Sequence, residues 1–329
     1  MNSSEIKYCP GTLSEGFSTY SRTALNRVFK GKKVYHVLPY DSPASNSETD
    51  EQLFEENRRL ISISGVQEKF SVLLEKNKLR LINEGERGTY ILKPIPSVGK
   101  KVDQIPANEH LTMQLARQVY GIETAENAMI FFKNGAPAYI TKRFDVNEDG
   151  TKRAQDDFAS LAGRTPQTHG EQYKYLGNYL EVFQLMQRYL LTYKLEAPKL
   201  LKLLLFNYLF SNGDAHLKNF SIVETTMGDY RLSPAYDLLN SRIHIEDKDF
   251  ALDDGLLPKN LAQGNIRLQF AKLAEHAAIS VKGFNDIIAL MISKSDIVEK
   301  MVEASFLNDS SKRNYWQSYK GRLNQLMKR

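Results

Sequence analysis

Several features that would define a class of protein are scarce in this chain of 329 residues. Its one cysteine, Cys9, excludes an intrachain disulfide and cannot build a zinc site alone. The six histidines are scattered, with no His-x-x-x-His pair that would indicate a metal site. No apolar run is long enough for a transmembrane helix, and the first residues are polar. We therefore expect a cytoplasmic protein with no membrane partner.

The charge balance points to no special class of partner. A net charge of +5 is mild and is not the signature of direct nucleic-acid binding, although it would favour an acidic protein or a nucleotide. Hydrophobic residues make up 42% of the chain and charged residues 25%, as is typical of a globular protein. The length is sufficient for two lobes with separate cores.

Strands come first along the chain and helices second, which predicts an α+β protein with a two-lobed, protein-kinase-like fold. We expect an N-terminal extension over residues 1–60, a β-rich N-lobe over 61–145 and a mostly helical C-lobe over 146–329. The extension is rich in Ser, Asn and Glu, so ordered structure is expected to begin at Ile61. The predicted strands lie at 70–74, 79–82, 90–93, 128–132, 138–143, 220–223 and 230–232, and the predicted helices at 107–120, 179–190, 198–211, 266–278, 281–291, 293–306 and 309–328.

The most informative segment is the polar loop that follows the apolar run ending at Phe210. Asp214 and Asn219 have the Asp-x-x-x-x-Asn spacing of a kinase catalytic loop, in which the Asp orients the attacking hydroxyl and the Asn holds magnesium. The predicted hairpin after Asn219 would return Asp237 beside it, so that two oxygen ligands face one Mg²⁺. Asn and Asp also commonly form turns, so each of these residues, taken alone, could serve only to shape the loop.

Two other residues of this loop are candidates for phosphate contacts. His216 could hydrogen-bond a phosphate or support the loop, and Lys218 could neutralise the phosphate being transferred. Both lie between the proposed catalytic base, Asp214, and the proposed metal ligand, Asn219.

A lysine ends an apolar strand in the first half of the chain. Kinases place such a lysine against the α- and β-phosphates of ATP, and Lys93 is the candidate here. Glu109, on the next predicted helix, could pair with it and orient it. A solvated strand-end lysine and a surface glutamate are the alternatives.

The segment over 61–69 occupies the expected place of a phosphate-covering loop. It has one glycine, Gly65, instead of the Gly-x-Gly-x-x-Gly pattern, but a tight turn at Ser64-Gly65 could still present backbone N–H groups to phosphate. Phosphorylation of its serines would add negative charge beside the nucleotide and weaken ATP binding. The alternative is an ordinary serine-containing turn.

With these motifs in place, the chain resembles the HipA family of serine/threonine kinases, which are toxins of bacterial toxin–antitoxin systems. The resemblance extends from about Ile61 to Leu307. It rests on Ser-Ile-Ser-Gly-Val-Gln-Glu-Lys (62–69), Tyr-Ile-Leu-Lys-Pro (90–94), Ala-Asn-Glu-His (107–110), Thr-Lys-Arg-Phe-Asp (141–145), Gly-Asp-Ala-His-Leu-Lys-Asn-Phe-Ser (213–221) and Leu-Ser-Pro-Ala-Tyr-Asp (232–237).

The resemblance implies ATP and Mg²⁺ as cofactors and assigns roles to residues. Asp214 would be the catalytic base, Asn219 and Asp237 the metal ligands, and Ser62 and Ser64 sites of autophosphorylation. At the position of Lys142 the family often has Glu, so we expect only a backbone contact with adenine there. The implied nucleotide-binding residues are Ser64, Gly65, Val66, Gln67, Glu68, Lys69, Lys93, Lys142, Arg143, Phe144, His216, Lys218 and Tyr236.

One departure from the family concerns the N-terminus. Full-length members carry an extra subdomain before the kinase core, whereas this chain has about sixty polar residues there. It is therefore most similar to the short form, HipT, which acts with a DNA-binding antitoxin, HipB, and a small protein, HipS. The resemblance implies a protein substrate, by family precedent an aminoacyl-tRNA synthetase, and inhibition of translation.

Two other functions are compatible with the sequence. One is a small-molecule kinase on the same scaffold, which would use the same Asp-x-x-x-x-Asn arrangement. The other is a non-catalytic pseudokinase subunit that binds a DNA-binding antitoxin.

Overall fold

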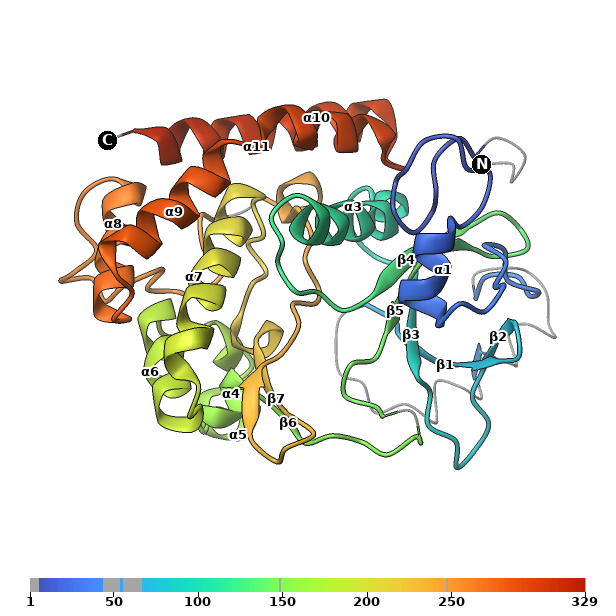
Figure 1. Cartoon of the computed structure of the whole chain (residues 1–329), viewed down its shortest axis with the longest axis horizontal. Coiled ribbons are helices and arrows are strands. Elements are labelled where there is room, and N and C mark those ends of the chain that lie inside the picture. The colour runs from blue at the N-terminus through green and yellow to red at the C-terminus, as the bar shows by residue number, and fades with distance from the viewer. Residues whose placement is uncertain (1–5, 44–53, 56–66, 148, 247, 329) are drawn as a thin grey trace. The chain divides into compact units, whose positions relative to one another are not determined.

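The computed structural model describes residues 6–43, 54–55, 67–147, 149–246 and 248–328. Two compact units are present, and the chain passes between them more than once (Figure 1). The first unit comprises residues 1–114, 125–151 and 300–312, and the second comprises 115–124, 152–299 and 313–329. No helix among the described residues is long and apolar enough to cross a membrane.

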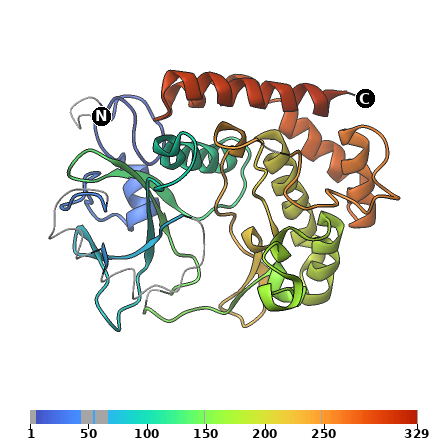
Figure 2. The ribbon, with the colours of Figure 1, turned by 180° about the vertical axis from the view of Figure 1, so that it is seen from behind.

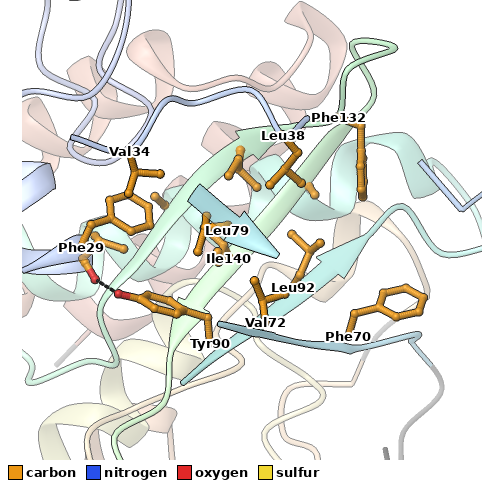
Figure 3. Close-up of a cluster of buried hydrophobic side chains, with 14 of the residues drawn as sticks. Phe29, Val34, Leu38, Phe70, Val72, Leu79, Tyr90, Leu92, Phe132 and Ile140 are labelled. Atoms are coloured by element: carbon orange, nitrogen blue, oxygen red, sulfur yellow. Dashed lines mark hydrogen bonds between the residues drawn. The ribbon is translucent and has the colours of Figure 1, made fainter. Parts of the chain in front are cut away.

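The first unit is built on a five-stranded antiparallel sheet with the order β2-β1-β3-β5-β4. The central strand β3 pairs on both sides, so that Leu92 lies opposite Phe70 on β1 and Ile140 on β5. These three side chains are fully buried and belong to one hydrophobic core (Figure 3). The strands are β1 Phe70–Glu75, β2 Lys78–Leu81, β3 Tyr90–Pro94, β4 Asn127–Phe131 and β5 Pro137–Lys142, and helix α3 spans Ile105–Gln118.

The N-terminal segment is part of this unit, and the expectation that ordered structure begins at Ile61 was wrong. Helix α1, Arg22–Phe29, starts at Ser21, whose side chain accepts a hydrogen bond from the N–H of Ala24. Phe29 is fully buried against the sheet core, and Tyr90 donates a hydrogen bond to the carbonyl of Val28 (2.8 Å; Figure 3). Polar composition hid this helix because only one of its faces is apolar.

The same segment also covers the edge of the sheet. The N–H of Leu38 donates to the carbonyl of Phe131 (2.7 Å), and the N–H of Phe131 donates to the carbonyl of His36 (2.8 Å). An exposed edge strand presents unpaired backbone groups to other chains, and here β4 has partners for them on its outer side.

The second unit is mostly helical. Its core helix α7 is apolar nearly all round and lies against α6 and α9, while α8 packs on α9 (Figures 1 and 2). A small antiparallel sheet of order β6-β7-β8 accompanies these helices. The helices that follow residue 152 are α4 Phe158–Leu161, α5 Pro166–His169, α6 Tyr179–Tyr189, α7 Tyr193–Leu209, α8 Ile266–His276, α9 Val281–Ile292, α10 Ser295–Ala304 and α11 Asp309–Met327. The last two are divided between the units. The strands are β6 Gln155–Asp157, β7 Ser221–Glu224 and β8 Tyr230–Leu232.

All the predicted strands and helices are present, with shifts of a few residues at their ends. The largest shift is in α7, which starts at Tyr193 rather than at Pro198, because the carbonyl of Thr192 already accepts bonds from Leu195 and Glu196. Sequence reasoning missed β6 and the short helices α4 and α5, which have too few residues for a periodic pattern.

Candidate active site

The loop that carries Asp214 begins with a sharp reversal at the end of α7. Ser211 has a left-handed backbone (φ 52°), and the N–H of Asn212 bonds back to the carbonyl of Asn207 (2.8 Å). Ser241 then holds the new direction, because its hydroxyl donates to the carbonyl of Ser211 and accepts from the N–H of Gly213 (both 2.8 Å). The reversal places Asp214 a few residues after the buried helix α7.

Asp214 has a half-exposed carboxylate that is held at one oxygen. The phenol of Tyr175 donates to Oδ1 of Asp214 (2.9 Å), while 46% of the Asp214 side chain is exposed. The side-chain amide of Asn219 donates to the backbone carbonyl of Asp214 (2.7 Å). That bond closes the loop on itself and fixes the orientation of the amide, so Oδ1 of Asn219 is its remaining acceptor.

His216 lies close to this carboxylate and is buried. Its Nε2 is 3.8 Å from Oδ1 of Asp214, and its ring meets the Tyr175 ring edge-on at 5.2 Å. Burial lowers the pKa of His216 to about 4, and the negative charge of Asp214 only partly offsets this effect. Its Nδ1 has no hydrogen-bond partner among the described residues. A neutral imidazole with an unpartnered buried nitrogen fits a site that receives a polar ligand.

The hairpin of β7 and β8 brings the following segment back to this loop, as the sequence predicts. The N–H of Ser233 donates to the carbonyl of Ser221 (2.9 Å), and the phenol of Tyr236 donates to the carbonyl of Lys218 (2.9 Å). Asp237 follows with a left-handed backbone (φ 54°) and is close enough that its charge raises the pKa of His216. Non-glycine residues in this conformation are uncommon and are concentrated at functional sites.

The donor set around the loop fits a hard divalent cation. Asn219 and Asp237 supply oxygen atoms, and Mg²⁺ is usually bound through one or two carboxylates together with substrate phosphates. Among the residues that the structure describes, no group of three or more His, Cys, Asp or Glu side chains is placed to hold a metal. The two oxygen donors suit a metal whose other ligands are phosphate oxygens and water.

In the first unit, Lys93 forms a buried ion pair with Glu109. Its Nζ lies 2.6 Å from Oε1 of Glu109, and only 3% and 4% of the two side chains are exposed. The Lys93 ammonium also lies 5.3 Å from the centre of the Tyr139 ring. The pair expected from sequence is present, and the alternatives of a solvated lysine and a surface glutamate are wrong.

The other predicted nucleotide-binding residues of this unit have varied surroundings. Gln67 donates to the carbonyl of Pro94 (3.2 Å), next to Lys93. The backbone N–H groups of Lys142 and Arg143 are already used, because they donate to the carbonyls of Glu126 and Thr89. The Arg143 side chain forms a two-pronged pair with Asp145, and Glu68, Lys69 and Phe144 are half-buried. Ser62, Ser64, Gly65 and Val66 lie outside the described residues.

Sequence reasoning missed two residues that shape the loop, Tyr175 and Ser241. Tyr175 reaches Asp214 from 39 positions earlier, and Ser241 reaches Gly213 from 28 positions later. No local spacing signals such contacts, because they depend on how distant segments pack.

Comparison with known proteins identifies the family. The HipA-like C-terminal domain matches residues 61–303. "Putative kinase Y4dM" of Sinorhizobium fredii is 29% identical over 296 residues, which cover 84% of this chain and 64% of that protein. "Putative kinase Y4mE" of the same organism is 31% identical over 192 residues, which cover 55% of this chain and 42% of that protein. The chain thus spans less than two thirds of the length of either relative.

Two solved structures share the fold. A chain in the complex of HipA, HipB and operator DNA from a Shewanella oneidensis toxin–antitoxin system matches with a TM-score of 0.62 and 19% identity, covering 88% of this chain and 73% of that one. The proinflammatory kinase CtkA of Helicobacter pylori matches with a TM-score of 0.51 and 13% identity, covering 77% and 92%. The α+β, kinase-like fold predicted from the sequence is confirmed. The family match covers most of the chain, and the chain belongs to the HipA-like C-terminal domain family.

Proposed function

We propose that this chain is an ATP-dependent kinase that phosphorylates serine or threonine in a protein. The observation that carries the proposal is the loop in which a half-exposed Asp214 carboxylate, the Asn219 amide and the returning Asp237 lie in one unit. The kinase names of its relatives agree with this assignment.

The residues of the loop have separate tasks in the proposed transfer. Asp214 accepts the proton of the substrate hydroxyl while the hydroxyl oxygen attacks the γ-phosphorus of ATP. A new oxygen–phosphorus bond forms, the bond between the γ-phosphorus and the bridging oxygen breaks, and ADP leaves. Asn219 and Asp237 would hold Mg²⁺, which neutralises phosphate charge when bound.

The Lys93–Glu109 pair serves the nucleotide. We assign Lys93 to the α- and β-phosphates of ATP, with Glu109 fixing the direction of the ammonium. The remaining nucleotide contacts are assigned to the segment over 64–69, to residues 142–144, and to His216, Lys218 and Tyr236. Positioning and charge neutralisation, rather than covalent catalysis, would supply most of the rate enhancement.

Within the family we propose the HipT type, with autophosphorylation of Ser62 and Ser64. A phosphate on either serine would place negative charge beside the nucleotide's own and reduce ATP binding. The protein would therefore carry its own inhibitory switch.

The proposed partners follow from the same family. The Shewanella structure contains HipB and operator DNA, which supports a HipB-like antitoxin as a partner of this chain. A HipS-like small protein and an aminoacyl-tRNA synthetase substrate, whose phosphorylation would inhibit translation, complete the proposal.

Mass spectrometry of the purified protein tests the proposal. After incubation with Mg-ATP, we expect phosphate on the peptide that contains residues 61–69, and none after incubation with ADP. Labelling of a metabolite fraction without any labelled protein would favour a small-molecule kinase instead. Absence of any transfer, with Mg-ATP still raising the melting temperature, would favour a pseudokinase.

A further inference from the structure

The side chain of Tyr175 contacts the Asp214 carboxylate, yet the proposed mechanism gives Tyr175 no role. Its phenol donates to Oδ1 of Asp214 at 2.9 Å. Burial, followed by the charge of Asp214 and this hydrogen bond, raises the pKa of Tyr175 above its usual value. Tyr175 therefore remains protonated at physiological pH and is a permanent donor.

The backbone around Tyr175 is held firmly in place. Tyr175 ends the short 3₁₀ turn Tyr173–Tyr175, and its carbonyl accepts a bond from the N–H of Asp253 (2.9 Å). Three more backbone bonds join residues 177–180 to residues 254–256, and Arg164 donates to the carbonyl of Leu176 (2.7 Å). Because these bonds fix the backbone of Tyr175, its phenol can hold the Asp214 carboxylate in one orientation.

The contact leaves one carboxylate oxygen for chemistry. Oδ1 of Asp214 faces both Tyr175 and His216, whereas no hydrogen bond to Oδ2 is present among the described residues. Nearly half of the Asp214 side chain is exposed, and Oδ2 is the carboxylate oxygen that the contacts with Tyr175 and His216 leave available to a hydroxyl. The ring of Tyr175 also packs edge-on against His216, so the same side chain contacts two members of the loop.

We propose that Tyr175 is a positioning residue for phosphoryl transfer, which fixes the Asp214 carboxylate so that Oδ2 receives the proton of the acceptor hydroxyl. This inference rests on the proposed kinase function. It assigns a role to a residue outside the 212–219 loop and its hairpin, on a segment that no kinase motif of the sequence includes.

Lys174, the neighbouring residue, adds positive charge at the same place. Its ammonium lies 5.0 Å from the centre of the Tyr175 ring, and its charge contributes to the lowered pKa of His216. The turn at 173–175 therefore supplies both a hydrogen-bond donor to Asp214 and a positive charge near His216.

The test compares Tyr175→Phe with Tyr175→Leu and with Tyr173→Phe, after phosphatase treatment and repurification of each protein. Tyr173 lies on the same turn, and among the described residues it is Tyr175, not Tyr173, that donates to Asp214, so Tyr173→Phe is the matched control. Rates of self-phosphorylation and the dissociation constant of Mg-ATP are measured for each protein, together with the melting temperature.

We expect Tyr175→Phe to transfer phosphate about 10- to 100-fold more slowly, the range for loss of one hydrogen bond to a charged group. Its dissociation constant for Mg-ATP should stay within about twofold of wild type, because the contact is made to Asp214 and not to the nucleotide. Tyr175→Leu should be slowed at least as much, and Tyr173→Phe should match wild type.

Three outcomes would overturn the inference, and they are distinguishable. An unchanged rate in Tyr175→Phe, with a loss only in Tyr175→Leu, would mean that ring packing matters and the hydroxyl does not. A slowed Tyr175→Phe with an equal loss of Mg-ATP affinity and of melting temperature would mean a general structural role. Absence of transfer by the wild-type protein would overturn the proposed function and this inference with it.

Discussion

Lys93 and Glu109 form an ion pair of 2.6 Å in which both side chains are almost completely buried. Each charge has lost its hydration, so each depends on the other for compensation. The pair also fixes Lys93 near the end of β3, and Lys93 is the residue that we propose for the α- and β-phosphates. It is therefore both a requirement for stability and a candidate functional element.

Glu109→Gln should destabilise the protein by about 3–5 kcal/mol, because it leaves the Lys93 ammonium buried without its counter-ion. Denaturant titration measures this change. The matched control is Glu86→Gln, which breaks the Arg80–Glu86 pair, where 35% and 32% of the side chains are exposed. That loss should be much smaller, because both side chains keep part of their hydration. An equal loss of unfolding free energy at the two sites would show that the buried pair stabilises the protein no more than an exposed pair does.

Removing the negative charge of Asp237 should weaken the binding of Mg²⁺ without unfolding the site. Asp237→Asn keeps the shape and tolerates the left-handed backbone, so the melting temperature should hardly change. The transfer rate should fall about 100-fold or more and recover partly at high Mg²⁺. Asp229→Asn, in the turn of the same hairpin, is the control and should keep the wild-type response to Mg²⁺.

The depressed pKa of His216 predicts a specific dependence of stability on pH. In the unfolded chain the pKa is close to 6.5, and in the folded protein it is about 4, so the unfolded state binds more protons between these values. Stability should therefore fall as the pH is lowered from about 6.5 to about 4, by about 3 kcal/mol from this residue. His216→Asn should lose less stability over this range. Identical pH curves for the two proteins would contradict the burial of a neutral imidazole.

The N-terminal segment should be essential for the stability of the first unit. Phe29 is fully buried between the rings of Tyr20 and Tyr90, at 5.1 and 5.9 Å, so Phe29→Ala should cost about 3–5 kcal/mol. The exposed Lys32→Ala is the control and should be nearly neutral. A negligible effect of Phe29→Ala on the unfolding midpoint would mean that this segment does not contribute to the core.

Local pattern was sufficient for most of the fold. The alternation around Lys76 and Asn77 predicts the β1–β2 hairpin, and the apolar run up to Leu209 predicts a buried helix. The hairpin predicted after Asn219 is present and returns the chain to this loop, where the phenol of Tyr236 donates to the carbonyl of Lys218.

Helix α1 and the contact between Tyr175 and Asp214 could not be predicted, because both depend on contacts between distant segments. Helix α1 is short, and it is stabilised by packing on a sheet whose strands begin about 40 residues later. Tyr175 reaches Asp214 only because backbone bonds to residues 253–256 hold its segment there. Side-chain contacts of this kind leave no periodicity in the sequence.

The most direct test of the account is phosphoryl transfer by Asp214→Asn compared with wild type at saturating Mg-ATP. We expect the wild-type protein to transfer the γ-phosphate to itself. In the variant, transfer should be lost while the dissociation constant of Mg-ATP stays close to wild type, because Asp214 acts on the acceptor hydroxyl. Transfer that persists in Asp214→Asn at the wild-type rate would contradict the assignment of this loop as the catalytic centre.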